Sequence, residues 1–277
     1  MHATSSALRQ PPPTMQPWEA VPAHCLATMR GVLFDVDDTL TRAGKLQTQS
    51  LDALWQAHAA GLRLVAATGR PLGFAQVWAA TWPVDAVVAE NGACWCWQAS
   101  GGLEVDYLDA APVRVAQQAQ LQAIEAAVAA ALPQLRRTDD SWLRRCELAW
   151  DIGERGAVPA ADVEALMALI HQHGARSLRS SIHLHAVVGQ ADKAQGLCRA
   201  VQQVLASDLA AERQHWVFVG DSGNDAAAFA FFPYAVGVAN VRAHAAVLTA
   251  WPRYVTAQSH GAGFAAVVQA IVQAQRR

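Results

Sequence analysis

A short apolar run that ends in a cluster of carboxylates is the feature that most constrains this chain. Residues 32–34 are apolar and are followed at once by Asp35, Asp37 and Asp38. The run is typical of a buried strand in a parallel sheet. Carboxylates are rarely buried without a cation, so the cluster indicates a divalent metal at the carboxyl edge of the sheet, where ligands bind. A solvated acidic turn capped by Thr39 is the simpler alternative.

Strands and helices alternate after this run, which predicts an α/β fold with a Rossmann-like parallel sheet core flanked by helices. The expected elements are helices over 50–60 and 72–80 and strands over 62–67 and 84–89. Thr68, Gly69 and Arg70 follow the second strand and therefore also lie at the carboxyl edge. A hydroxyl beside a glycine suits a phosphate oxygen. Thr68 could at the same time cap the helix that follows.

A second junction between a strand and carboxylates lies near the C-terminus. An expected strand over 215–219 leads into Asp221, Asn224 and Asp225. Two aspartates four residues apart at the start of a helix can reach one cation, whereas capping of that helix would explain only one of them. Lys193 opens another expected helix, where the dipole disfavours a cation. Its position indicates an anion nearby, and a solvated surface lysine is the alternative.

The alternation of single strands and helices is interrupted between the two halves of this core. Residues 93–188 predict an inserted α+β domain, and the core comprises residues 30–92 and 189–277. The expected elements of the insertion are a hairpin over 93–107, helices over 113–132 and 160–173, and strands over 143–152 and 177–188. The proline-rich residues 1–29 predict a flexible leader, with Met29 as a hypothetical alternative start of translation.

Together these motifs resemble, in order, the four motifs of the haloacid-dehalogenase (HAD) superfamily of phosphohydrolases. The matching positions are Asp35-Val36-Asp37-Asp38-Thr39, Thr68, Lys193, and Asp221 with Asp225. The insertion is similar to the C2B cap of subclass IIB, found in sucrose-phosphate, trehalose-phosphate, mannosyl-phosphoglycerate and Cof-type sugar phosphatases. Glu90-Asn91-Gly92 and residues 259–264 also resemble this subgroup.

The resemblance implies a Mg²⁺-dependent phosphatase that hydrolyses a small phosphomonoester, expected to be a sugar phosphate, through an aspartyl-phosphate. It implies Asp35 as nucleophile and Asp37 as general acid and base. The implied metal ligands are Asp35, Asp37 through its backbone carbonyl, Asp221 and Asp225. The implied substrate-binding residues are Thr68, Gly69, Arg70, Asn91, Lys193 and Asn224. A phosphomutase and a catalytically silent sugar-phosphate-binding protein are the alternatives.

Substrate choice is expected to depend on the cap. Candidate contacts are Arg144, Arg145, Glu147, Arg179, His183 and His185. The two histidines share a strand face, and packing inside the cap is their alternative role. Trp95, Trp97, Trp142 and Trp150 fall in the expected cap, where they could stack on a sugar or pack the sheet.

Composition excludes several partners. The chain has 277 residues, 53% of them hydrophobic, and a formal net charge of −2. This balance offers no basic surface for nucleic acid and no polybasic patch for a membrane. The expected partner, a small phosphorylated metabolite, is what the resemblance implies. Five scattered cysteines form no disulfide framework and predict reduced thiols in a cytoplasmic protein.

Overall fold

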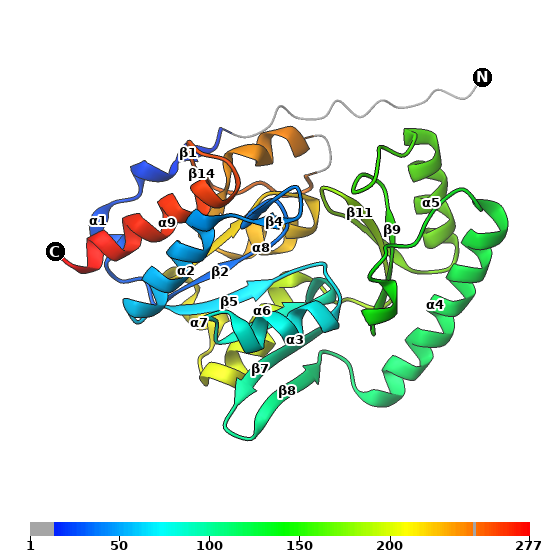
Figure 1. Cartoon of the computed structure of the whole chain (residues 1–277), viewed down its shortest axis with the longest axis horizontal. Coiled ribbons are helices and arrows are strands. Elements are labelled where there is room, and N and C mark those ends of the chain that lie inside the picture. Colours follow the sequence, from blue (N-terminus) through cyan, green and yellow to red (C-terminus); the bar gives the residue numbers. More distant parts are fainter. Residues whose placement is uncertain (1–13, 246–247) are drawn as a thin grey trace.

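The protein consists of a sheet-based core with a smaller cap domain beside it (Figure 1). The structure is a computed structural model and describes residues 14–245 and 248–277. Nine strands form the core sheet in the order β1-β14-β13-β12-β2-β5-β6-β7-β8. All neighbours from β1 to β6 in that order are parallel, and β7 and β8 are added antiparallel at one edge. The α/β class with a parallel core sheet is therefore confirmed.

The core strands are β1 (Gln16–Pro17), β2 (Gly31–Phe34), β5 (Arg63–Ala67), β6 (Ala86–Ala89), β7 (Cys94–Ala99), β8 (Gly102–Tyr107), β12 (Trp216–Gly220), β13 (Tyr234–Gly237) and β14 (Tyr254–Val255). The core helices are α1 (Ala23–Leu26), α2 (Thr48–Ala59), α3 (Leu72–Thr81), α6 (Lys193–Leu205), α7 (Leu209–Glu212), α8 (Ala226–Phe231) and α9 (His260–Gln275). A small hairpin, β3 (Thr41–Arg42) with β4 (Lys45–Leu46), follows β2.

Helices cover both faces of the core sheet because side chains alternate along its central strands. In β2, Val32 and Phe34 join the core cluster that α1, α2, α3 and α9 cover, while Leu33 joins the cluster under α6, α7 and α8. Phe34 packs against Phe264 of α9 with ring centroids 5.0 Å apart. Burial on both faces explains why this strand reads as a continuous apolar run.

The cap domain has its own hydrophobic core. Its sheet has the order β10-β11-β9, all antiparallel, from β9 (Glu147–Asp151), β10 (Arg176–Arg179) and β11 (His183–Val187). The helices α4 (Ala111–Ala131) and α5 (Ala160–Gln172) pack on one face through residues such as Ile124 and Leu166. Leu184 and Ala186 of β11 belong to that cluster. His183 and His185 therefore lie on the opposite face of the sheet.

Two predicted boundaries inside the insertion differ from the structure. The hairpin expected at the start of the cap is β7–β8, which extends the core sheet by pairing β7 with β6. Cys94 and Cys96 are buried in the core cluster, so the cap begins only at α4, and we place it at residues 110–188. The single strand expected over 177–188 is two strands, because a tight turn joins Ser180 and His183. The N–H of His183 donates to Ser180 Oγ, and the N–H of Ser180 donates to the carbonyl oxygen of His183, both at 3.0 Å.

The described part of the expected leader, residues 14–29, is folded onto the core. Gln16 and Pro17 pair with β14, and α1 lies beside α9 (Figure 1). Trp18 and Met29 are 1% and 2% exposed in the main core cluster. The prediction of a flexible leader is therefore wrong for these residues, and residues 1–13 lie outside the described part of the chain.

We expect Trp18→Ala to lower the free energy of unfolding by about 3–5 kcal/mol, because it empties a fully buried site. The ring also packs edge-on against Tyr254, with centroids 6.0 Å apart. Chemical denaturation measures the change, with Trp55→Ala as the control, since Trp55 is 52% exposed. Equal effects of the two substitutions would show that residues 14–29 do not stabilise the core.

Among the described helices, none combines the length and the apolar character that a membrane span requires.

Candidate active site

Three buried aspartates meet at the carboxyl edge of the core sheet. Asp35 follows β2, and Asp221 follows the neighbouring strand β12. Asp225 ends the short turn after Asp221 and is held there because its Oδ2 accepts the N–H groups of Asp221 and Ser222 at 2.9 and 3.0 Å. Oxygens of Asp35, Asp221 and Asp225 all lie within 4.8 Å of one another. Burial raises the pKa of Asp35 and of Asp221 well above its ordinary value.

Lys193 brings a positive charge into this cluster. Its Nζ donates to Asp35 Oδ1 at 2.5 Å and to Asp225 Oδ1 at 2.7 Å, and its side chain is fully buried. Burial alone would lower the pKa of Lys193, but Asp225 and Asp35 raise it above its ordinary value. The surface role considered for this lysine is therefore excluded.

Close packing of two glycines sets the position of Lys193. A Cβ on Gly196 would lie 2.5 Å from Gly92 Cα, and a Cβ on Gly92 would lie 1.9 Å from the carbonyl oxygen of Asp192. Without these side chains α6 can approach the turn after β6. Asp192 caps α6 by accepting the N–H of Gln195 at 2.9 Å. The first turn of the helix thus begins beside the end of the sheet, where Lys193 reaches Asp35.

The aspartate cluster fits a divalent cation. Three carboxylates face one ammonium group in a fully buried site, which leaves negative charge without a partner and makes burial costly. All the side-chain donors are carboxylate oxygens, the type that Mg²⁺ prefers. The Asp37 side chain is not among the three, and the expected contribution of its backbone carbonyl stays a prediction.

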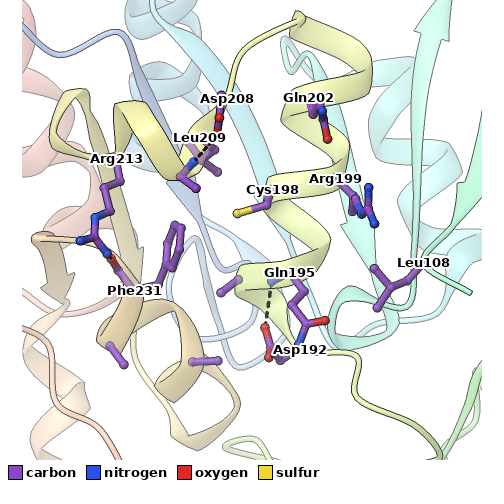
Figure 2. Close-up of a pocket in the computed structure, with 14 residues that line it drawn as sticks. Leu108, Asp192, Gln195, Cys198, Arg199, Gln202, Asp208, Leu209, Arg213 and Phe231 are labelled. Carbon is purple, nitrogen blue, oxygen red and sulfur yellow. Dashed lines mark hydrogen bonds between the residues drawn. The ribbon is translucent and has the colours of Figure 1, made fainter.

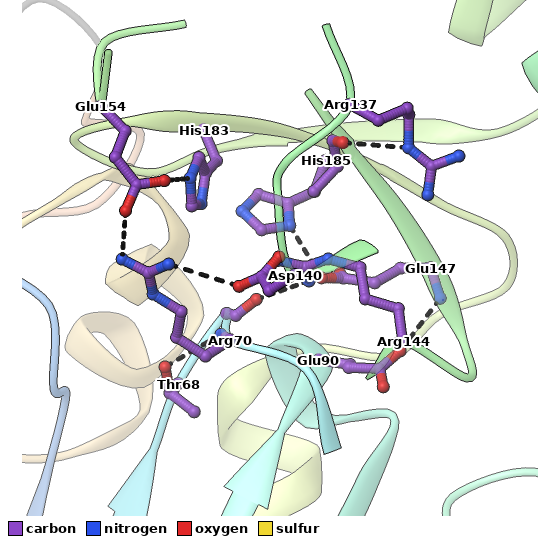
Figure 3. A network of polar contacts seen from close by, with 12 residues as sticks. Thr68, Arg70, Glu90, Arg137, Asp140, Arg144, Glu147, Glu154, His183 and His185 are labelled. Carbon is purple, nitrogen blue, oxygen red and sulfur yellow. Dashed lines mark hydrogen bonds and ion pairs between the residues drawn. The ribbon is translucent and has the colours of Figure 1, made fainter. Parts of the chain in front are cut away.

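Arg70 connects the core edge to the cap (Figure 3). Its guanidinium group binds Asp37, with Nε 3.0 Å from Oδ2 and Nη2 3.0 Å from Oδ1. The same group contacts Asp140 Oδ2 at 3.3 Å and Glu154 Oε1 at 3.0 Å, both in the cap. Glu154 in turn bonds His183 Nε2 at 2.9 Å. Any shift of the cap therefore changes the charges around Asp37.

A second chain of contacts crosses from cap to core. Arg144 donates to the carbonyl oxygen of Gly69 at 2.7 Å and to Glu147 Oε1 at 2.5 Å. Glu147 Oε2 accepts from Asn91 Nδ2 at 2.8 Å, and Asn91 Oδ1 accepts from Asn224 Nδ2 at 2.9 Å. The side-chain amides of Asn91 and Asn224 are therefore both hydrogen-bonded within the protein. Asn91 positions Asn224 and Glu147, and only Asn224 lines the cavity described below.

Glu90 fastens the same cap segment to the start of α3. Its buried carboxylate accepts the backbone N–H groups of Leu72, Arg145, Cys146 and Glu147 at 2.6–3.2 Å. Burial, with Glu147 nearby, raises the pKa of Glu90 to about 7. The backbone at Glu90 and Asn91 has positive φ values of 49° and 54°, so this turn is strained.

The raised pKa of Glu90 predicts a pH dependence of stability. The folded protein retains a proton that the unfolded chain releases near its ordinary value of 4.5. The retained proton contributes about 3 kcal/mol to the free energy of unfolding. This contribution is fully present below the pKa of Glu90 in the unfolded chain and is lost as the pH rises through about 7. We expect the free energy of unfolding to fall more between about pH 5 and about pH 8 in the wild type than in Glu90→Gln. Parallel pH profiles would contradict the assignment.

A small cavity lies between core and cap, over the carboxylates. Its lining is drawn from both domains and consists of Asp35, Asp37, Gly69, Ser180, Ser181, His183, His185, Ser222 and Asn224. Its free volume of about 10 Å³ is that of a single water. A larger substrate therefore requires the cap to shift away from the core. Another hollow, about 700 Å³, lies beside α6 around Cys198 and Phe231 and contains none of Asp35, Asp37, Asp221 and Asp225 (Figure 2).

Several predicted residues have roles other than those expected. Thr68 does not cap α3, because Pro71 occupies the N-cap and the Thr68 hydroxyl accepts the N–H of Arg70 at 2.9 Å. The side chains of Arg145 and Arg179 are exposed. Of the tryptophans expected in the cap, Trp95 and Trp97 pack in the core, Trp150 packs in the cap core, and Trp142 is 73% exposed.

Other site residues were missed by the sequence reasoning. Asn240 donates to Asp221 Oδ2 at 3.1 Å and to the carbonyl oxygen of Asp38 at 3.0 Å. Asp140 and Glu154 reach Arg70 from polar loops with no distinctive pattern. The sequence marks Glu90 only as part of Glu90-Asn91-Gly92, which resembles the family. Its position directly after an apolar strand is the signal that could have indicated a buried carboxylate.

Comparisons with known proteins agree with this fold. Residues 30–273 match the family model of sucrose-6F-phosphate phosphohydrolase. No curated protein matches the chain by sequence. A solved Thermoplasma acidophilum protein has 17% identity and a TM-score of 0.66, over 88% of this chain and 98% of that one. The sucrose-phosphatase of Synechocystis, solved with sucrose and phosphate, has 19% identity and a TM-score of 0.62. The match covers 88% of this chain and 98% of that one. A putative HAD/COF-like hydrolase from Plasmodium vivax has 17% identity and a TM-score of 0.64, over 90% and 98%.

The family match spans the core and the cap together. The chain is thus a phosphoric monoester hydrolase of the HAD superfamily. More narrowly, it belongs to the sucrose-6F-phosphate phosphohydrolase family, which confirms the resemblance to the sugar phosphatases of subclass IIB.

Proposed function

We propose that this protein hydrolyses a sugar phosphate with Mg²⁺ and through an aspartyl-phosphate on Asp35. The observation that carries the proposal is the position of Asp35 in the cavity, held by Lys193 and within reach of Asp221 and Asp225. A protein that only binds sugar phosphates needs no buried carboxylate aimed at the phosphoryl group. The geometry therefore favours chemistry over silent binding.

In the first step, an oxygen of Asp35 attacks phosphorus and the ester oxygen departs with a proton from Asp37. Asp221 and Asp225, with Asp35 and the Asp37 carbonyl, would hold Mg²⁺, which supplies positive charge to the phosphoryl oxygens. Lys193, the Thr68 hydroxyl and the backbone at Gly69 stabilise the same charge. Asn224 lines the cavity and orients the substrate.

In the second step, Asp37 accepts a proton from the water that attacks the aspartyl-phosphate. The Asp37 side chain that accepts this proton is bound by the Arg70 guanidinium group through two contacts of 3.0 Å. Substrate binding has to weaken that pair before Asp37 can donate a proton in the first step. Because Arg70 also contacts the cap at Asp140 and Glu154, opening of the cap provides a way to do so.

The substrate class rests on the family and on one solved relative. The Synechocystis sucrose-phosphatase was solved in complex with sucrose and phosphate. We extend this to a phosphorylated sugar as the substrate of the present chain. All five cysteines are free thiols, which supports the cytoplasmic location that we also propose.

Release of inorganic phosphate from a panel of sugar phosphates tests the proposal. We expect release in Mg²⁺ and its loss in a chelator, with recovery when Mg²⁺ is restored, because the three carboxylates repel a phosphate when no cation is bound. Release that is unaffected by the chelator would contradict the metal assignment. Conversion to an isomeric phosphate without free phosphate would instead identify a phosphomutase.

A further inference from the structure

Two buried polar atoms of residues that line the cavity have no hydrogen-bond partner within the part of the chain that the structure describes. They are Nε2 of His185 and Oγ of Ser181, both from the cap. His185 is 0% exposed, so its free nitrogen is shielded from bulk water. A buried polar atom without a partner is costly, which makes each of them a candidate for contact with a ligand.

Glu147 and Gly69 hold the imidazole ring of His185 in place. Its Nδ1 bonds Glu147 Oε1 at 2.7 Å, and its Cε1 would lie 3.2 Å from a Cβ on Gly69. Figure 3 shows the other ring nitrogen pointing away from Glu147. Because Asp35, Asp37 and Gly69 line the same cavity, Nε2 faces the region where the phosphate ester has to lie.

Electrostatics determine which hydrogen bond Nε2 can make. Burial would raise the pKa of Glu147, but His185, Arg144 and Asn91 hold it below its ordinary value. Burial lowers the pKa of His185. A neutral ring therefore donates its Nδ1 proton to the Glu147 carboxylate and keeps Nε2 as an acceptor. Ser181 Oγ can donate or accept.

We propose that His185 Nε2 and Ser181 Oγ bind hydroxyl groups of the leaving group beside the phosphorylated carbon. The pair makes the site specific for phosphate esters of polyhydroxy alcohols over esters without hydroxyls. A site built to hydrogen-bond a hydroxyl rejects an analogue that lacks it, because the buried protein atom then stays unpaired. The inference rests on the proposed function and adds the residues that select the leaving group.

The test compares two esters in each variant. One is the best sugar phosphate from the panel above, and the other is p-nitrophenyl phosphate, whose leaving group has no aliphatic hydroxyl. We expect His185→Phe to lower kcat/KM for the sugar phosphate by about 10- to 100-fold and to leave p-nitrophenyl phosphate within about threefold of the wild type. The inhibition constant of inorganic phosphate should not change.

Ser181→Ala covers the case in which His185→Phe does not fold, since the Ser181 hydroxyl makes no bond within the described chain. It should lower kcat/KM for the sugar phosphate alone, by about threefold to tenfold. The matched control is Ser177→Ala, whose hydroxyl bonds His171 at 2.9 Å away from the cavity. Equal losses with both esters, or no loss in either variant, would overturn the inference. Absence of phosphate release from every ester by the wild type would instead overturn the proposed function.

Discussion

Asp35→Asn is expected to lower kcat by a factor on the order of 10⁴ or more, as removal of a covalent nucleophile does in other enzymes. The amide is similar in size to the carboxylate but is a far weaker nucleophile. The substitution also removes one of the three negative charges that would hold Mg²⁺. Phosphate release under saturating sugar phosphate and Mg²⁺ measures the effect.

Asp52→Asn is the matched control for this loss. Asp52 lies on α2 and is exposed, so its substitution should leave kcat unchanged. Asp35→Asn should also remain folded, because replacing a buried carboxylate by an amide relieves repulsion with Asp221 and Asp225. Turnover by Asp35→Asn at a rate comparable to the wild type would show that the nucleophile lies elsewhere.

Lys193→Met is expected to have the second largest effect, on stability and on rate together. It leaves Asp35 and Asp225 buried without their cation, which should lower the free energy of unfolding by about 3–5 kcal/mol. Loss of one charge that stabilises the phosphoryl oxygens should lower kcat by a factor of about 10² to 10³. Thermal unfolding and phosphate release, each with Mg²⁺ and with a chelator, measure the two effects.

The stability loss should be larger in the chelator, because bound Mg²⁺ would compensate part of the missing charge. Lys45 provides the control, as it is the other lysine of the chain and lies exposed on β4. Lys45→Met should change neither quantity. A Lys193→Met variant as stable and active as Lys45→Met would contradict the charge balance that we assign to the site.

The residues at the sheet edge could be predicted from the sequence because local pattern determines their place. A buried parallel strand reads as an apolar run, so Asp35 and Asp221 are marked by the residues before them. Both strands end at the same edge, and the structure brings the two carboxylates together as expected. Lys193 was marked by its unfavourable position in the first turn of a helix.

The contacts between cap and core could not be predicted in this way. Arg70 meets Glu154 across 84 positions of sequence, and no periodicity couples them. The β7–β8 hairpin alternates like any antiparallel pair, so its pattern does not say whether it joins the cap or the edge of the core sheet. The partners of His183 and His185 likewise depend on how the two domains meet.

The central claim is a covalent phosphoryl group on Asp35, and mass spectrometry of the enzyme quenched in acid during turnover tests it most directly. We expect a mass increase of one phosphoryl group on the peptide that contains Asp35. This increase should be absent in a chelator and in Asp35→Asn. Turnover without any phosphorylated peptide, or with the phosphoryl group on a histidine, would contradict the account.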